Sequence, residues 1–351
     1  MGKLAAVVSV ITLLAGCGTC AACAGSTPES TPALTTATPP TPIYDVHEWG
    51  LLRGTADDGV MLSGPHSDPP AIALAKPVLY FHRAGDGPLT VDVSVVIPRG
   101  QIIEHWPLGE TGGHPETITW PRVTVQAGTC PGARYPSPSE PPCTSVSDGC
   151  ESAELATVET DDGDCLQTAD GTAWNHLFYR GAIEGAPSLP LRLETLDDGR
   201  LRVTNTGTAQ IAGRLLRLHH DGVGRTDAAL VASPPSPGAQ ATLAVPAGRA
   251  QDAADALVES LRAAGLTDPE ARAFRRSWDA TLFGSGVVAE ASAEAPPAAT
   301  AMGASPAPAP WTSVVYVLPE ATAETLATLQ LSPPPRAVHR AIVAWIDEAR
   351  P

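Results

Sequence analysis

Histidine is the residue type in this chain that best combines metal binding with acid–base chemistry near neutral pH. A neutral imidazole nitrogen binds transition metals, and a nearby carboxylate supplies either a further ligand or a general base. The chain contains nine histidines, some of them next to glutamate and some within apolar segments. The candidate site residues are His47, Glu48, His82, His105, His219 and His220.

None of these candidates lies in a known catalytic motif. His47-Glu48 begins like the His-Glu-x-x-His pattern of zinc-binding helices, but the fifth position is Leu51. If the segment is an extended strand, adjacent side chains point to opposite faces, and His47 and Glu48 cannot converge on one ion. The same constraint separates His219 from His220. We therefore expect no metal at His47 and no cofactor, and we assign no catalytic residue.

Clustered carboxylates offer a second, weaker candidate for a metal site. Residues 161–164 read Asp-Asp-Gly-Asp, and oxygen ligands on a tight loop suit calcium. The segment lacks the spacing of a helix-loop-helix calcium site, so a solvated turn is the favoured interpretation. Residues 57–59, Asp-Asp-Gly, receive the same interpretation.

The N-terminus has the pattern of a bacterial export signal. Lys3 supplies a positive charge, and Leu4 to Leu14 is an uncharged apolar run that is too short to span a bilayer. Leu14-Ala15-Gly16-Cys17 then predicts a lipoprotein signal peptide, residues 1–16, with lipid attached through the thiol of Cys17. The alternative is an ordinary secretory signal cleaved after Ala24.

Composition predicts the cellular location of the protein and the class of its partners. Residues 17–42 are rich in Thr, Pro, Ala and Ser, which is typical of a disordered tether. We expect a lipid-anchored protein of the bacterial cell envelope, outside the cytoplasm, with the outer membrane favoured over the inner. A formal net charge of −16 argues against nucleic acid as a partner. The expected partners are the membrane, through Cys17, and a protein or saccharide of the envelope.

Four of the seven cysteines form a separate group. An even number of cysteines in an exported chain predicts two disulfides, and zinc is disfavoured because the group contains no Cys-x-x-Cys pair. Three connectivities are open, and pairing in sequence order is favoured, first with second and third with fourth. The disulfide candidates are Cys130, Cys143, Cys150 and Cys165.

Hydropathy patterns predict an α+β fold with an antiparallel β-sandwich-like core and C-terminal helices. The clearest hairpin is 191–203, where Asp-Gly separates two segments of alternating leucine and arginine. The other strands expected are 77–82, 89–97, 118–125, 155–158, 211–218 and 314–318. Helices are expected at 250–264, from a capping-box pattern beginning at Thr267, and at 336–349.

A single globular domain, 43–351, accounts for these elements. Two segments rich in proline and small residues, at about 127–165 and 285–310, are expected to be loop excursions. Aromatic residues beside the strands are expected to fill the core, although a carbohydrate-binding groove is the alternative. They are Trp49, Tyr80, Phe81, Trp106, Trp120 and Trp174. Trp49 is expected to anchor the start of the domain.

Several short sequence segments follow one another in an order that is typical of a protein family. His47-Glu48-Trp49-Gly50 is followed by segments at 76–82, 177–181, 265–278, 315–319 and 331–335. This order resembles an uncharacterised family of bacterial exported proteins marked by His-Glu-Trp-Gly at the start of the domain. The chain departs from that family at Leu51-Leu52, where the family has Thr-Phe. The resemblance implies one continuous fold and transfers no catalytic residue.

The sequence therefore favours a membrane-anchored envelope lipoprotein that serves as a binding or structural module. The alternative is a hydrolase or metal-dependent enzyme that uses His47, Glu48 and a second histidine. Whether the histidines converge in the fold separates these two functions.

Overall fold

β-Strands dominate the computed structural model, which describes residues 44–55, 71–85, 87, 89–130, 156–185, 187–231, 233–284 and 309–348. The expected signal peptide, tether and lipidation site lie outside the described residues. So do Cys143, Cys150, the acidic segment 57–59 and most of the two expected loop excursions. Contacts group Pro42–Pro351 into one compact unit.

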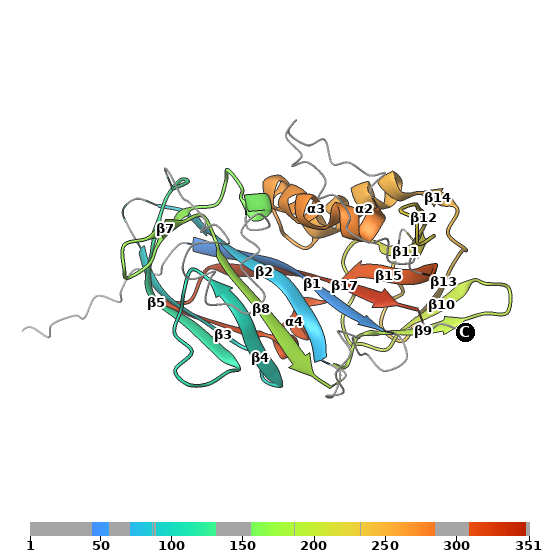
Figure 1. Ribbon diagram of the computed structural model, residues 1–351, viewed down its shortest axis with the longest axis horizontal. Coiled ribbons are helices and arrows are strands. Elements are labelled where there is room, and N and C mark those ends of the chain that lie inside the picture. Colours follow the sequence, from blue (N-terminus) through green and yellow to red (C-terminus); the bar gives the residue numbers. More distant parts are fainter. Residues whose placement is uncertain are drawn as a thin grey trace, which may run out of the picture. The chain divides into compact units, whose positions relative to one another are not determined.

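A nine-stranded sheet forms the centre of this unit, with β1 near its middle (Figure 1). β1 pairs in parallel with β17 and antiparallel with β2, and the other pairs in the sheet are antiparallel. In spatial order the strands are β14 (Gly248–Arg249), β12 (Thr226–Val231), β11 (Leu215–His220), β15 (Trp311–Val317), β17 (Ala337–Asp347), β1 (Tyr44–Thr55), β2 (Ala71–Arg83), β8 (Leu177–Glu184) and β4 (Gly100–Trp106).

Among the described residues, two smaller antiparallel sheets, three α-helices and a 3₁₀ turn accompany the central sheet. The five-stranded sheet contains β16 (Thr328–Ser332), β3 (Leu89–Val96), β5 (Thr117–Gln126), β6 (Cys165–Gln167) and β7 (Ala173–Trp174). The three-stranded sheet contains β13 (Gln240–Leu243), β10 (Leu201–Asn205) and β9 (Leu191–Thr195). The helices are α2 (Ala250–Ala263), α3 (Asp268–Phe283), the short α4 (Glu320–Leu326) and the 3₁₀ turn η2 (Ala156–Val158). Among the described helices, none is both long and apolar enough to cross a membrane.

The central sheet is buried on both faces, as alternate residues of β1 show. Val46 and Leu52 belong to a core shared with strands of the two smaller sheets. Trp49 and Leu51 belong to a second core that includes α2 and α3, and Figure 1 shows these two helices side by side along the central sheet. The period-two alternation of a strand thus sends successive side chains of β1 into different cores.

Much of the predicted pattern is present in the structure, including the α+β class with a β-sandwich-like core. The predicted hairpin is β9–β10, with Leu201 opposite Thr195 and a left-handed Gly199 in its turn. α2 and α3 lie where helices were expected. The aromatic residues expected in the core are buried: Trp49, Tyr80, Phe81, Trp106, Trp120 and Trp174.

The helix predicted for 336–349 is wrong, because the segment forms β17. Its residues alternate between the two cores, with Ile342 and Ala344 in the first and Val343 and Trp345 in the second. A strand that is covered on both faces reads as a continuous apolar run, and periodicity alone does not separate such a run from a buried helix. In the structure the segment is a strand, because β17 pairs with β15 on one side and with β1 on the other.

The strand predicted for 155–158 is also wrong in its described part, which is the 3₁₀ turn η2. The segment packs against α3 instead of joining a sheet. Arg276 donates from its side chain to the carbonyl oxygens of Thr157 and Glu159, and the hydroxyls of Thr157 and Ser277 are 2.7 Å apart. These contacts with α3 satisfy polar groups that a strand would pair with a neighbouring strand.

The disulfide joins Cys130 to Cys165, so the expected pairing of cysteines in sequence order is wrong. Cys165 lies on β6 opposite Gln126 of β5, and its amide donates to the carbonyl oxygen of Gly128. Cys130, four residues beyond the end of β5, is therefore brought next to Cys165. The register of two strands sets this pair, and the length of the intervening segment does not.

We predict that the mature protein carries a second bond, Cys143–Cys150. With Cys130–Cys165 formed, this is the pairing that remains within the group of four. Peptide mapping without reduction checks the assignment, and free thiols at both residues would contradict it.

The Cys130–Cys165 bond spans a sequence separation of 35 residues. Its loss through Cys130→Ala should lower the free energy of unfolding by roughly 3–4 kcal/mol.

We predict that Trp49→Ala lowers the free energy of unfolding by roughly 3–5 kcal/mol, because the indole is fully buried and truncation leaves a cavity. The Trp49 ring packs edge-on against Phe274 of α3, with centroids 5.4 Å apart, so the loss loosens β1 from the helices. Equilibrium unfolding in urea measures the change. Leu108→Ala is the control: Leu108 is 62% exposed, and its truncation should change stability by less than about 0.5 kcal/mol. A similar small change for Trp49→Ala would contradict the anchoring role.

Candidate functional site

Two of the predicted histidines lie on neighbouring strands and on the same face of the central sheet. In the β1–β2 pair, Asp45 lies opposite His82 and His47 lies opposite Tyr80, so His47 and His82 are diagonal neighbours. Their ring centroids are 4.3 Å apart. Both imidazoles face the side of the sheet that α3 covers, as their contacts with Glu270 show.

Glu270 reaches these histidines from the first turn of α3. The Thr267 hydroxyl accepts from the Glu270 amide, and Oε2 of Glu270 accepts from the Thr267 amide at 2.8 Å. This reciprocal pair is the capping box that the sequence predicts. The box fixes the start of α3 and also holds the Glu270 carboxylate in one orientation.

Each carboxylate oxygen of Glu270 contacts one histidine. Nδ1 of His47 lies 2.8 Å from Oε2, and Nε2 of His82 lies 2.7 Å from Oε1. One nitrogen from each ring and one oxygen of Glu270 all lie within 4.8 Å of one another. Glu270 is completely buried, whereas 21% of the His82 side chain remains exposed. His47, His82 and Glu270 are called the His–Glu cluster below. Glu270 is 223 residues from His47 and 188 residues from His82 in the sequence, so the fold brings the three together.

Electrostatics within the cluster favour an ionised carboxylate. Burial raises the pKa of Glu270, but hydrogen bonds from His47, His82 and the Thr267 backbone outweigh burial and lower this pKa to about 2. Burial lowers the pKa of His82, and the contact with Glu270 outweighs that effect, so the pKa of His82 is raised overall. The ionised carboxylate of Glu270 therefore lies between two imidazoles, each of which contacts one of its oxygens.

A third histidine packs against the cluster. His339 lies on β17 opposite His47, and the His339 ring meets the His47 ring edge-on at 5.1 Å between centroids. The corner between α2 and α3 covers the other side of His339: a Cβ on Gly265 would come within 2.4 Å of its Nδ1. Gly265 also has a φ of +100°, which an L side chain rarely adopts. Glycine at this position lets the helices approach the cluster.

Glu48 belongs to a different network, on the opposite face of β1. The Tyr179 hydroxyl donates to Oε1 of Glu48 at 2.6 Å, and the Arg340 guanidinium donates to Oε2. Arg340 also donates to Glu324. Burial and the neighbouring Glu48 carboxylate raise the pKa of Tyr179. The expectation that His47 and Glu48 point apart is confirmed, so an active site that combines these two residues is not formed.

The remaining histidine candidates do not join the cluster. His105 packs edge-on against Trp120, and burial lowers its pKa. His219 faces the Thr312 hydroxyl at 3.3 Å. Its neighbour His220 stacks on Trp311, and burial lowers the pKa of His220 to about 4. Adjacent residues on β11 point to opposite faces, as predicted for this pair.

The acidic turn at 161–164 has a structural role. Asp164 accepts hydrogen bonds through its two carboxylate oxygens from the backbone amides of Arg83 and Gly128. These bonds hold the turn between the end of β2 and the segment that follows β5. Backbone amides thus occupy the oxygen atoms that a calcium ion would need from this residue.

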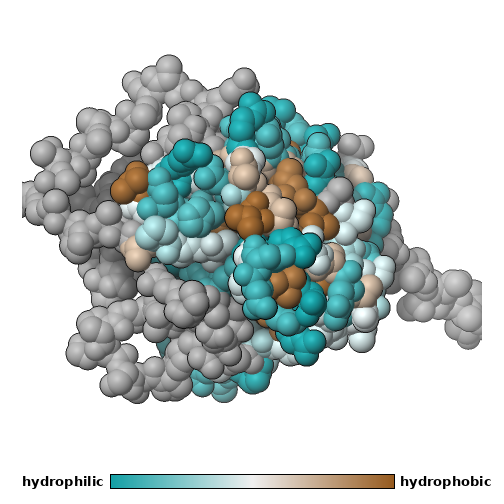
Figure 2. All heavy atoms as spheres, turned by 90° about the vertical axis from the view of Figure 1, so that its right-hand side faces the viewer, coloured by the Kyte–Doolittle hydropathy of each residue, from teal (hydrophilic) through white to brown (hydrophobic). Residues whose placement is uncertain are grey.

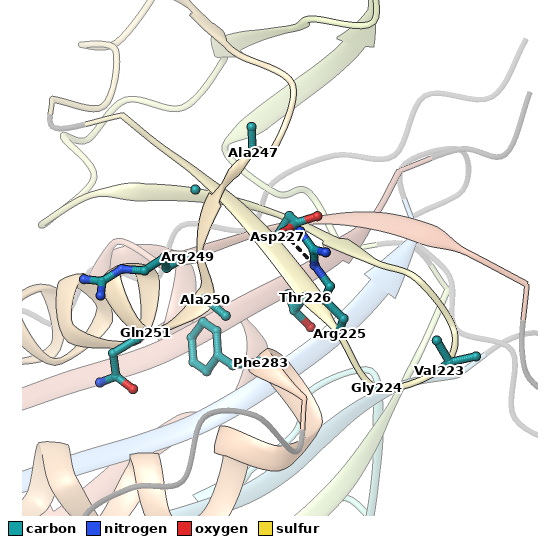
Figure 3. A pocket seen from close by; sticks show the side chains of 11 residues that line it. Val223, Gly224, Arg225, Thr226, Asp227, Ala247, Arg249, Ala250, Gln251 and Phe283 are labelled. Atoms are coloured by element: carbon teal, nitrogen blue, oxygen red, sulfur yellow. Dashed lines mark hydrogen bonds and ion pairs between the residues drawn. The ribbon is translucent and has the colours of Figure 1, made fainter.

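A groove of about 680 Å³ lies where β12 and β14 meet the start of α2 and the end of α3 (Figure 3). Arg225, Arg249 and Phe283 are among its lining residues, and Figure 3 shows Arg225 turned toward Asp227. Arg225 pairs with Asp227, and Arg249 pairs with Asp252. The lining includes none of the three residues of the His–Glu cluster.

Comparisons with known proteins add little to this geometry. No protein-family model matches the chain, and no curated protein matches it. Solved structures that match include the Fcho1 Mu homology domain of Danio rerio with a bound Eps15 peptide. That likeness has a TM-score of 0.34 and 9% identity, and it covers 88% of this chain and 97% of the other. Values this low support no inference about fold or function.

We predict that Glu48→Gln lowers the free energy of unfolding by roughly 3–5 kcal/mol, because it leaves the buried Arg340 guanidinium without its buried counter-charge. Glu324→Gln is a matched control, since it removes the other carboxylate of the same arginine. The Glu324 side chain is 46% exposed, and its loss should cost less than about 1 kcal/mol. Urea unfolding of both variants measures the difference, and equal costs would contradict the assignment.

Proposed function

We propose that this chain is a lipid-anchored protein of the bacterial cell envelope whose domain serves as a binding or structural module. The observation that carries the proposal is that an eleven-residue apolar run ends at Leu14 and is followed by Ala15, Gly16 and Cys17. Lipidation needs a thiol at that position, and the following 17–42 segment has the composition of a flexible tether. The proposed resemblance to the exported His-Glu-Trp-Gly family agrees with a location in the cell envelope.

The Cys130–Cys165 bond supports an exported location. Disulfides form and persist in oxidising compartments and are rare in the cytosol. Cys130 is buried, with 6% of the residue exposed, and its amide donates to the side chain of Asn175 at 2.8 Å. The bond is thus packed into the domain, as a structural disulfide is, and is not an exposed pair suited to redox exchange.

The surface supports a polar partner and not nucleic acid. Figure 2 shows one face of the molecule, on which small hydrophobic areas are interrupted by hydrophilic side chains. With a net charge of −16, the chain has no general attraction for phosphate backbones. We propose a protein or saccharide of the envelope as the partner, because contacts with either can combine small apolar areas with polar groups.

A metal-dependent enzyme is the second candidate function, and one observation favours it: His47 and His82 converge on Glu270. Glu48 has no part in that candidate, because Arg340 and Tyr179 occupy its carboxylate on the other face of β1. Two histidines and one carboxylate resemble the ligand sets of catalytic zinc sites, which keep an open position for water. The envelope role stands independently of this activity.

We predict that Cys17→Ala abolishes membrane association and leaves unprocessed precursor, because the acceptor of the lipid is gone. Membrane fractionation, together with incorporation of a labelled fatty acid, measures the loss. Cys20→Ala is the matched control: it removes a nearby thiol and should leave lipidation and fractionation unchanged. Normal cleavage and release of the Cys17 variant, for example after Ala24, would overturn the lipoprotein assignment.

A further inference from the structure

We propose that His47, His82 and Glu270 form a binding site for a divalent transition-metal ion, with zinc the best-suited ion. The site goes beyond the envelope role and does not depend on lipidation. It differs from the sequence-based expectation that His47 is not a ligand. That expectation weighed His47 against Glu48, its neighbour in sequence, whereas the partner supplied by the fold is Glu270.

The donor atoms are of the kinds that zinc and related ions prefer. Imidazole nitrogen suits zinc, copper, nickel and iron, and a single carboxylate completes a three-residue set without a soft thiolate. Calcium and magnesium prefer sites built from oxygen ligands, so two histidines disfavour both of these ions. The ligand set therefore favours a transition metal over the more abundant hard cations.

The charge balance of Glu270 points to a cation. Three other buried carboxylates of the described residues face arginine: Glu48 faces Arg340, Glu104 faces Arg180, and Asp279 faces Arg275. A fourth, Asp164, accepts hydrogen bonds from backbone amides. The ion pairs of Glu270 in the described part of the chain are with the two histidines. Imidazole, unlike guanidinium, is not a permanent cation, and its ring nitrogens bind metal ions. A divalent ion bound to both rings would supply the positive charge that arginine supplies at those three carboxylates.

The ligands are held in place before any ion binds. The Thr267 amide fixes the Glu270 carboxylate through the capping box, and His339 packs edge-on against the His47 ring. Supporting contacts of this kind orient metal ligands and tune their affinity. His47 and His82 are fixed relative to each other by the register of β1 and β2. Because all three ligands come from regular elements, metal binding requires little additional ordering.

Only a small adjustment is needed to receive the ion. Zinc–ligand bonds are about 2.0–2.2 Å long, so two ligand atoms at a tetrahedral angle on one ion lie about 3.3–3.6 Å apart. The three donor atoms here lie within 4.8 Å. Each ligating nitrogen must present its lone pair to the ion. Its proton therefore moves to the other ring nitrogen of a neutral imidazole, or passes to solvent from a protonated one.

His82 provides the route of entry. Its side chain is 21% exposed, whereas Glu270 is completely buried and His47 is nearly so. An ion therefore meets His82 first and reaches the carboxylate behind it. Three protein ligands leave a position for water or an external donor, which places that position on the His82 side.

Metal uptake by the full mature chain tests the proposal. The mature chain is purified, free thiols are alkylated, and bound metal is removed with a chelator. After dialysis against zinc, elemental analysis should find about one equivalent, and zinc should raise the melting temperature. Cobalt as a substitute should give the visible absorption of a site with nitrogen and oxygen ligands.

Three variants show where the ion binds. Glu270→Gln keeps the side-chain length and can keep the capping box, which accepts glutamine, yet it should weaken zinc binding by more than about 100-fold. His82→Ala should abolish both stoichiometric uptake and the zinc-dependent rise in melting temperature. His105→Ala is the matched control and should retain one equivalent, since His105 packs against Trp120 outside the cluster.

Two results would overturn the proposal. One is a wild-type protein that takes up no stoichiometric zinc or cobalt. The other is full uptake by both Glu270→Gln and His82→Ala, which would place the ion elsewhere. If Glu270→Gln does not fold, His82→Ala decides the question, because His82 lies at the exposed side of the cluster.

Discussion

A completely buried carboxylate must be compensated, and Glu270 is the buried carboxylate that joins the helices to the sheet. An uncompensated charge at this depth would cost several kcal/mol, so its neighbours are constrained by its presence. His47 and His82 supply that compensation from two strands, and Thr267 supplies it from the start of α3. The position of α3 over β1 and β2 therefore depends on one side chain as well as on the apolar contacts around Trp49.

β1 makes this arrangement possible because it lies inside a sheet that is covered on both faces. Its odd-numbered residues from His47 to Leu51 meet the helices, whereas Val46, Glu48 and Leu52 meet the other core. Two polar networks thus begin at two consecutive residues of β1, His47 and Glu48, and lie on opposite faces of the sheet. On one side the Glu48 charge is balanced by Arg340, a permanent cation. On the other side Glu270 faces imidazoles, whose charge depends on protons and which can bind metals.

Sequence patterns located most elements and two of the three cluster residues, but not their convergence. The capping box at Thr267 and Glu270 was visible as a helix start, because its spacing is local. Its second role was not visible, since the partner His82 lies 188 residues away and only the packing of α3 on the sheet joins them. The error at 336–349 has a related cause: burial on both faces removes the alternation that marks a strand. Cys130 and Cys165 likewise meet because β5 pairs with β6, and no local spacing specifies that pairing.

The disulfide and the His–Glu cluster strengthen different parts of the domain. Cys130–Cys165 fixes the segment after β5 to β6 in the five-stranded sheet, whereas the cluster fixes α3 to the central sheet. A covalent bond restrains the unfolded chain, while hydrogen bonds to a buried charge, or a metal in their place, act only once the fold has formed. The disulfide therefore lowers the entropy of the unfolded chain, whereas the cluster contributes only when α3 lies on the central sheet.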